Sequence, residues 1–204
     1  MAPRIIECHQ GSPEWYQARL GIPTASEFST IIAKGRDGGE SKTRRSYLLK
    51  LAGEILTGEP MENYSNGNME RGKELEDEAR ELYELMKDAD ATRVGFIING
   101  DKGCSPDSLI GNDGGLEIKI ALPHIQVDRL LRGSLPPEHK AQVQGSLWVT
   151  EREWWDFCSH CPKLPPLIVR AYRDDGYIAN LSGAVQAFNN ELADVVYSIK
   201  KGSA

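Results

Sequence analysis

The sequence predicts an α/β fold in which a mixed central β-sheet is flanked by helices. Segments with helical periodicity and capping residues alternate along the chain with short segments of strand character, as in layered α/β domains. A chain of 204 residues, 40% of them hydrophobic, can bury one substantial core. We therefore expect residues 1–204 to form a single domain, without internal repeats or a low-complexity linker.

Helix punctuation marks the first half of the chain. Ser12 supplies an N-cap, Pro13 occupies the first helical position and Gly21 ends the helix. Thr24-Ala25-Ser26-Glu27 has the pattern of a capping box and predicts a second helix through Ile32. Two more helices are expected at about residues 41–56 and over the strongly charged residues 68–83.

A hairpin with a glycine-rich turn lies in the middle of the chain. Residues 93–98 have strand character and lead into it, and residues 111–115 supply the turn. Residues 116–120 then alternate apolar and charged side chains with period two, which places Glu117 and Lys119 on one face. Two helices, two strands and a terminal helix are expected after it, at about residues 122–132, 136–148, 154–158, 167–172 and 178–200.

The charge distribution neither requires nor excludes a nucleic-acid substrate. The net charge of −6 argues weakly against one, because most proteins that neutralise phosphates are basic. Positive charge gathers in residues 34–50, and acids gather in residues 70–90. A metal-dependent nuclease tolerates this balance because bound cations offset its carboxylates. The alternative for the basic cluster is a solvated helix face.

The chain shows no signal for export or for a membrane. It has no apolar run of spanning length and no signal peptide at its start, so we expect a cytoplasmic protein without a membrane partner. The four cysteines are too few and too scattered for a disulfide framework. Cys158-Ser159-His160-Cys161 suggests zinc, but no second pair completes four ligands, which favours plain buried or solvent-facing thiols.

Asp107, Glu117 and Lys119 form the first candidate site. Carboxylates on adjoining strands suit a hard divalent cation such as Mg²⁺, and two such ions can hydrolyse a phosphodiester. Lys119 would orient the attacking water or stabilise charge on the phosphate. Glu76, on the charged helix, is an acid that could border the core and reach a metal. Acidic pairs around glycine turns also occur on ordinary surfaces, so the pattern alone leaves both interpretations open.

Arg19, Thr24 and Ser26 form a second candidate site, for a phosphate. Helix starts attract anions through unpaired N–H groups, and a guanidinium and two hydroxyls would add hydrogen bonds. The alternative is structural: Thr24 and Ser26 cap a helix, and Arg19 pairs with a carboxylate.

Four segments resemble phage lambda exonuclease and its viral recombinase relatives. The segments occur in the family's order and cover most of the chain: residues 15–27, residues 72–80, residues 105–107 with 116–119, and residues 141–150. The resemblance implies a restriction-endonuclease-like core and Mg²⁺-dependent 5′-to-3′ digestion of one strand at double-stranded DNA ends, with two ions per active site. It further implies that Mn²⁺ can substitute, that a 3′ overhang remains, that the chain forms a ring-shaped homotrimer, and that a single-strand annealing protein is its partner in a phage-infected bacterium.

Six residues match the active site of this family: Asp107, Glu117, Ile118, Lys119, Glu76 and Gln142. The two acids of the hairpin and the backbone carbonyl of Ile118 match metal ligands, and Lys119 matches the catalytic lysine. Glu76 matches a helical acid that holds the second metal and its water. Gln142 matches a glutamine that helps to position the nucleophile.

Other matches concern contacts with DNA. Arg19 and Ser26, with Thr24 between them, match the pocket for the 5′-terminal phosphate. Arg36 matches a DNA-contacting arginine by its loop position alone, and Met69 stands where relatives carry an apolar wedge that parts the terminal base pair.

Two rival functions remain. A restriction-type endonuclease with the same core would also cut covalently closed circles. A non-catalytic DNA-binding recombination module would keep the fold without the chemistry, although the intact set of Asp107, Glu117 and Lys119 argues against it.

Overall fold

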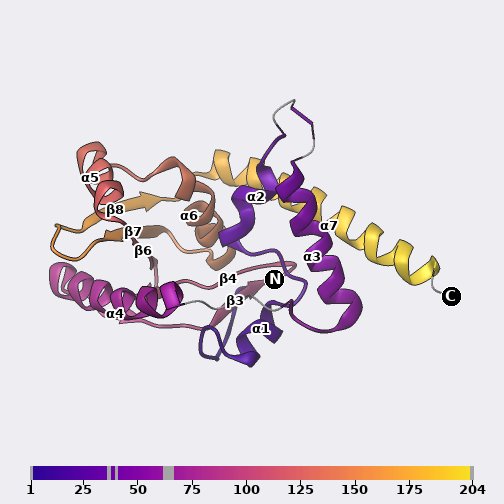
Figure 1. The fold of residues 1–204 in the computed structure, drawn as a ribbon, viewed down its shortest axis with the longest axis horizontal. Coiled ribbons are helices and arrows are strands. Elements are labelled where there is room, and N and C mark those ends of the chain that lie inside the picture. The colour runs from indigo at the N-terminus through magenta and orange to yellow at the C-terminus, as the bar shows by residue number, and fades with distance from the viewer. Residues whose placement is uncertain (1, 36–37, 40, 62–66, 203–204) are drawn as a thin grey trace.

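The computed structural model contains two β-sheets and the helices that cover them (Figure 1). It describes residues 2–35, 38–39, 41–61 and 67–202, with side chains from residue 74 onward in the last range. The helices are α1 (Pro13–Arg19), the 3₁₀ helix η1 (Ala25–Glu27), α2 (Phe28–Ile32), α3 (Lys42–Thr57), α4 (Gly67–Lys87), α5 (Pro123–Arg132), α6 (Pro137–Thr150) and α7 (Asp175–Gly202). The strands are β1 (Arg4–Ile6), β2 (Ala91–Thr92), β3 (Phe96–Asn99), β4 (Lys102–Cys104), β5 (Ser108–Ile110), β6 (Gly114–Ile120), β7 (Trp154–His160) and β8 (Leu167–Tyr172).

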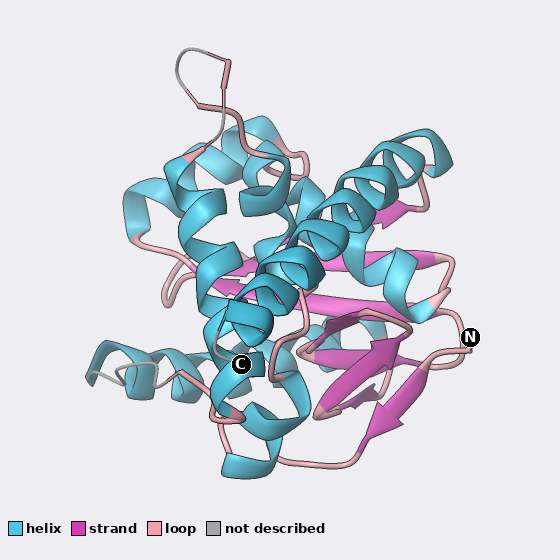
Figure 2. Cartoon of the chain, turned by 90° about the vertical axis from the view of Figure 1, so that its right-hand side faces the viewer, coloured by secondary structure: helices cyan, strands magenta, loops and turns pink. Residues whose placement is uncertain are grey.

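The larger sheet is mixed, as predicted. Its five strands lie in the order β2-β5-β6-β7-β8, and only the β6–β7 pair is parallel among them. A parallel pair needs a crossover connection, which α5 and α6 provide between these two strands. The smaller sheet, β1-β3-β4, is antiparallel and lies beside the N-terminus (Figure 2).

Helices cover both faces of the larger sheet. On one face, Leu116 and Ile118 of β6 pack with Ala79 and Tyr83 of α4 in a small buried cluster. On the other face, a larger core forms around side chains such as Phe157 of β7 and includes residues of α2, α3, α6 and α7. Glu117 and Lys119, which alternate with Leu116 and Ile118, therefore point away from α4. The period-two pattern predicted this division correctly.

Several helix ends follow their capping residues. The Ser12 hydroxyl accepts a hydrogen bond from the Trp15 N–H at the start of α1, at 3.3 Å. Ser41 does the same at the start of α3, and Gly58 ends that helix in the left-handed conformation, with φ 72°. Local signals thus mark the start of α1 and both ends of α3. Among the described helices, none is both long and apolar enough to cross a membrane.

The capping box predicted at Thr24 is wrong. The Thr24 side chain makes no capping hydrogen bond, and the chain forms a short 3₁₀ turn, η1, before α2 begins at Phe28. The hydroxyl lies instead 3.4 Å from Arg19 Nη2 and 3.1 Å from Ser26 Oγ. A tertiary contact with Arg19 has replaced the local one.

The strand predicted over residues 93–98 is confirmed only for residues 96–98, which belong to β3. Residues 93–95 form a break between β2 and β3, which belong to different sheets. Gly95 lies in this break, where a Cβ atom would come within 2.4 Å of the Cys8 carbonyl oxygen. The close passage of the N-terminal segment therefore separates the two strands. Strands β1 and β4 were not predicted, because three-residue strands carry little periodicity.

Candidate active site

The β5–β6 hairpin brings Asp107, Glu117 and Lys119 together. Asp107 directly precedes β5, and its Oδ2 accepts a hydrogen bond from the Ile118 N–H at 2.5 Å. Lys119 Nζ lies 2.5 Å from Glu117 Oε1. The antiparallel register pairs Ser108 with Leu116, so the residues that flank this pair meet at the same end of the hairpin. The structure thus brings these three residues together at one end of the hairpin.

Helix α6 adds Gln142 to the centre. Gln142 Nε2 donates a hydrogen bond to Glu117 Oε1 at 2.6 Å, so Gln142 and Lys119 contact the same oxygen atom. Glu117 is only 3% exposed. Among the described residues, its second oxygen, Oε2, has no hydrogen bond to the protein and is available to a ligand.

Glu76 approaches from α4 through Arg80. Arg80 Nη2 lies 2.8 Å from Glu76 Oε1 and 3.4 Å from the Asp107 carbonyl oxygen. Arg80 Nε also donates to Ser108 Oγ at 2.9 Å, and the Arg80 side chain is 7% exposed. The sequence analysis missed Arg80, although its position four residues after Glu76 on a helix was a usable signal.

The electrostatics show that three carboxylates crowd this site. Burial, followed by the negative charges of Glu117 and Glu76, raises the pKa of Asp107 well above its usual value. Burial alone would lower the pKa of Lys119, but Glu117, Asp107 and Glu76 together raise that pKa above its usual value. Lys119 therefore stays charged, and Arg80 supplies a second positive charge through its ion pair with Glu76.

These side chains fit a hard divalent cation by their chemistry. The donors are oxygen atoms, which Mg²⁺ prefers, and a cation would relieve the repulsion among the carboxylates. Within the described part of the chain, no three His, Cys, Asp or Glu side chains are already gathered as a metal cluster. Protein groups hold each carboxylate instead: the Ile118 N–H holds Asp107, Lys119 and Gln142 hold Glu117, and Arg80 holds Glu76.

Cys158 and Cys161 are free buried thiols, one of the two states predicted for them.

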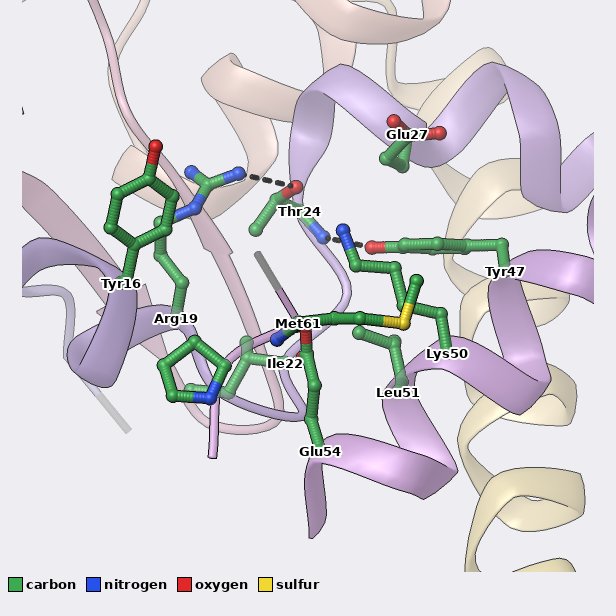
Figure 3. A pocket seen from close by; sticks show the side chains of 11 residues that line it. Tyr16, Arg19, Ile22, Thr24, Glu27, Tyr47, Lys50, Leu51, Glu54 and Met61 are labelled. Carbon is green, nitrogen blue, oxygen red and sulfur yellow. Dashed lines mark hydrogen bonds between the residues drawn. The ribbon is translucent and has the colours of Figure 1, made fainter. Parts of the chain in front are cut away.

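Arg19, Thr24 and Ser26 also lie together, in a second site next to the first. Arg19 Nη1 donates to Ser105 Oγ at 2.8 Å, and its Nη2 donates to Thr24 Oγ1, which in turn contacts Ser26 Oγ. Ser105 lies two residues before Asp107, so the two sites adjoin. Among the described residues, the side-chain hydrogen bonds of Arg19 go to hydroxyl groups, that of Thr24 included (Figure 3), and not to a carboxylate. Burial lowers the pKa of Arg19, while the charges of nearby groups, Glu27 and Glu54 among them, act in the opposite direction.

The sequence analysis missed two residues that hold Arg19 in place, Trp15 and Ser105. Trp15 lies under the guanidinium, whose Cζ is 4.1 Å from the ring centroid. Trp15 Nε1 also donates to Ser105 Oγ, at 2.9 Å. Both residues fall within segments that carry the family resemblance, which was the available signal. The two remaining predicted DNA contacts, Arg36 and the Met69 side chain, lie outside the residues that the structure describes.

Comparisons with known proteins identify the family. Residues 14–153 match the YqaJ-like viral recombinase domain. The chain is similar to the alkaline exonuclease LHK-Exo from Laribacter hongkongensis, with 32% identity and a TM-score of 0.84 over 94% of this chain and 98% of that one. For LHK-Exo in complex with dAMP the values are 33% and 0.85, with the same coverage.

A more distant structure shows the fold alone. A phage-related exonuclease from Haemophilus somnus 129PT has a TM-score of 0.67 at 14% identity, over 87% of this chain and 96% of that one. Among curated proteins no match is found. The predicted α/β fold with a helix-flanked mixed sheet is thus the fold of solved exonucleases. On the domain match and the 32–33% identity, this chain belongs to the YqaJ-like viral recombinase family, the relatives of lambda exonuclease.

Proposed function

We propose that this chain is a Mg²⁺-dependent nuclease that digests one strand of duplex DNA from a 5′-phosphorylated end, in the 5′-to-3′ direction. The observation that carries the proposal is the spacing of the two sites. Ser105, which contacts Arg19, lies two residues before Asp107, so one short segment joins the Arg19 site to a carboxylate centre. Similarity to an alkaline exonuclease supports the same reaction class.

The metal would be held by Asp107, Glu117, the Ile118 carbonyl and Glu76. When bound, Mg²⁺, or Mn²⁺ in its place, supplies an activated water and neutralises charge on the scissile phosphate. We propose two ions per site, with Glu76 serving the second. The donor chemistry and the raised pKa of Asp107, which burial, Glu117 and Glu76 produce, support this assignment.

Lys119 and Gln142 act on the reacting groups rather than on the metal. The Lys119 ammonium, whose pKa the surrounding carboxylates raise, remains charged and stabilises negative charge on the phosphate. Gln142 contacts the same Glu117 oxygen as Lys119, which places its amide beside the reaction centre and suits it to orient the nucleophile.

Direction follows from the Arg19 site. A 5′-terminal phosphate held by Arg19, Ser105 and Ser26 would place the next phosphodiester at the carboxylate centre. Hydrolysis there releases the terminal nucleotide and presents a new 5′-phosphate, and repetition leaves a 3′ single-stranded overhang.

The assembly and the partner are further parts of the proposal. Membership of the viral recombinase family supports a ring-shaped homotrimer that encloses its product, and a single-strand annealing protein that receives the overhang. Head-to-tail contacts between subunits close naturally into such a ring. Light scattering that shows a monomer, together with processive digestion, would contradict the ring.

One assay tests the activity. Purified protein is incubated with Mg²⁺, Mn²⁺ or EDTA on linear, nicked and covalently closed duplex DNA, and products are followed over time. We expect metal-dependent release of mononucleotides from linear DNA carrying a 5′-phosphate. Cutting of closed circles would indicate a restriction-type endonuclease, and DNA binding without cleavage would indicate a non-catalytic recombination module.

A further inference from the structure

Arg80 is a buried link between helix α4, which lies alongside the larger sheet (Figure 1), and the candidate active site. In the described part of the chain its guanidinium donates to four groups: Glu76 Oε1, Asp77 Oδ1, the Asp107 carbonyl oxygen and Ser108 Oγ. The first two acceptors belong to α4, and the last two lie where β5 begins. Because a guanidinium carries its donors in a rigid planar fork, one side chain can hold groups of two elements at fixed positions.

Ser108 strengthens this link. Its hydroxyl accepts from Arg80 Nε at 2.9 Å and donates to the Asp107 carbonyl oxygen at 2.6 Å. Ser108 is fully buried, so a loss of either hydrogen bond would leave a polar group unpaired away from water. Arg80, Ser108 and the Asp107 backbone therefore fix α4 relative to the β5–β6 hairpin.

The three acids that we assign to the metal share one pattern of hydrogen bonding. In each carboxylate one oxygen atom is held by a protein donor: Asp107 Oδ2, Glu117 Oε1 and Glu76 Oε1. The other oxygen atom has no hydrogen bond to the described residues, and it is not among their buried unpaired atoms, so a ligand can reach it. Carboxylates that bind metals are commonly oriented by hydrogen bonds of this kind.

Glu76 differs from the two hairpin acids in what orients it. Asp107 and Glu117 belong to a hairpin whose register fixes them, whereas the Glu76 side chain is 34% exposed on a helix. Among the described residues, Arg80 is its only hydrogen-bond partner, at 2.8 Å. A free glutamate side chain loses rotamer entropy when it is ordered. The contact with Arg80 orders Glu76 before any ion arrives.

We infer that Arg80 is a positioning residue for the second metal ion. It holds one oxygen of Glu76 beside the Asp107 segment and leaves Oε2 for the ion. This inference rests on the proposed assignment of Glu76 to the second ion. Arg80 does not touch substrate, and it acts through Glu76.

The charge of Arg80 acts against its positioning effect. A guanidinium near a metal ion repels it, which by itself would make the second ion bind more weakly when Arg80 is present. Ion pairs with Glu76 and Asp77, both at 2.8 Å, offset most of that charge. Loss of a group that orients a metal ligand typically costs about 10–100-fold in metal affinity, so positioning outweighs repulsion.

The experiment counts bound Mn²⁺ by electron paramagnetic resonance of the free ion, in the presence of a 5′-phosphorylated duplex whose first linkage resists hydrolysis. The Mg²⁺ concentration for half-maximal digestion is measured separately. The proteins are the wild type, Glu76→Ala, Arg80→Met and Arg80→Lys. Arg93→Met is the matched control, because Arg93 also pairs with Asp77 but has no contact with Glu76 among the described residues.

We expect the wild type to bind two ions and Glu76→Ala to bind one. Arg80→Met should bind the first ion like the wild type and the second at least about tenfold more weakly. Its half-maximal Mg²⁺ concentration should rise by a similar factor, while kcat at saturating Mg²⁺ falls less. Arg80→Lys should be intermediate, since an ammonium keeps the charge without the fork. Arg93→Met should behave like the wild type.

The outcomes separate this inference from the proposed function. If the wild type binds two ions and Glu76→Ala one, then a second ion bound as well or better by Arg80→Met, or an equal weakening of both ions, overturns the role of Arg80 alone. A wild type that binds fewer than two ions, or a Glu76→Ala variant that still binds two, overturns the second-ion assignment and the inference with it. Thermal unfolding in EDTA shows whether Arg80→Met folds. If it does not, Arg80→Lys decides, and a second ion bound there as in the wild type overturns the inference.

Discussion

The Oδ2 atom of Asp107 accepts a hydrogen bond of 2.5 Å from the backbone N–H of Ile118. This contact fixes the residue before β5 to the middle of β6, where Glu117 and Lys119 flank Ile118. Register is decisive here, because a shift of one residue would move Glu117 and Lys119 to the opposite face of the sheet. The chemistry of the candidate site therefore depends on the pairing of one short hairpin.

Replacement of either hairpin acid should abolish digestion. Asp107→Ala or Glu117→Ala removes a carboxylate that we assign to the metal, and we expect a loss of at least about 10³-fold in kcat with the fold retained. Asp113→Ala is the control, because Asp113 is exposed in the turn of the same hairpin. Substantial Mg²⁺-dependent cleavage by either purified variant would defeat the assignment.

Lys119→Met should separate catalysis from metal binding. The ammonium is expected to act on the phosphate, so kcat should fall by about 10²–10³-fold while calorimetry shows Mn²⁺ binding close to that of the wild type. Gln142→Leu should give a smaller loss of the same kind, since it removes a single neutral donor near Glu117. A loss of metal affinity in Lys119→Met as large as in the acid variants would reassign the lysine to a structural role.

Arg19→Ala should remove most of the preference for a 5′-phosphate. A hydrogen bond to a charged group contributes about 1.5–3 kcal/mol, so the ratio of kcat/KM for phosphate over hydroxyl ends should fall by about one to two orders of magnitude. Ser105→Ala, which removes the hydroxyl that orients Arg19, should lower it less. Ser182→Ala should have no effect, because the Ser182 hydroxyl bonds within α7, to the Ala179 carbonyl oxygen. If Arg19→Ala keeps the preference, the anion site lies elsewhere, for example among the basic residues 34–50.

Gly145→Val should destabilise the fold. A Cβ atom on Gly145 of α6 would lie 2.5 Å from Phe28 Cδ2, inside a fully buried contact. Overpacking of this kind costs about 1–3 kcal/mol in the free energy of unfolding, measurable by urea denaturation. Gly183→Ala in α7 is the matched control, because nothing lies within 4 Å of its added Cβ, and it should stabilise by about 0.4–1 kcal/mol. Equal stability of Gly145→Val and the wild type would show that α2 and α6 can separate freely.

His139 should make the protein less stable in mild acid. Its Nε2 lies 2.8 Å from Arg129 Nη2, which can only donate, so the imidazole must be neutral there. Burial, Lys119 and Arg129 lower the pKa of His139 to about 4, against about 6.5 in an unfolded chain. Between pH 6.5 and 4, His139 binds a proton in the unfolded state but stays neutral in the folded state. The contribution of neutral His139 to the free energy of unfolding is therefore fully present above pH 6.5 and is lost as the pH falls through 4.

Urea midpoints at pH 7, 5 and 4 measure this loss. His139→Gln keeps an acceptor for Arg129 but cannot take up a proton, so its midpoint should fall less over the same range. Identical pH dependence in the two proteins would show that His139 is not the group responsible.

Local chemistry predicted much of the fold. Ser12, Ser41 and Gly58 mark helix ends because their contacts lie within a few residues along the chain. The alternation in β6 predicted which side chains share a face, since successive residues of a strand point in opposite directions. The local capping pattern at Thr24 failed because a tertiary contact replaced it. The Thr24 hydroxyl contacts Arg19 and Ser26 instead of capping a helix.

By itself, the sequence determined the two sets of chemical groups: Asp107, Glu117 and Lys119 in one segment, and Arg19 with its neighbouring hydroxyls in another. The tertiary structure alone decided how they are held. Arg19 meets Ser105 across 86 residues, and Gln142 meets Glu117 across 25. Tyr47 of α3 meets Thr24 across 23 residues, through the Thr24 N–H and the Tyr47 hydroxyl. Periodicity and capping follow from the backbone over a few residues, whereas such pairs follow from how whole helices and sheets pack, which no short stretch of sequence specifies.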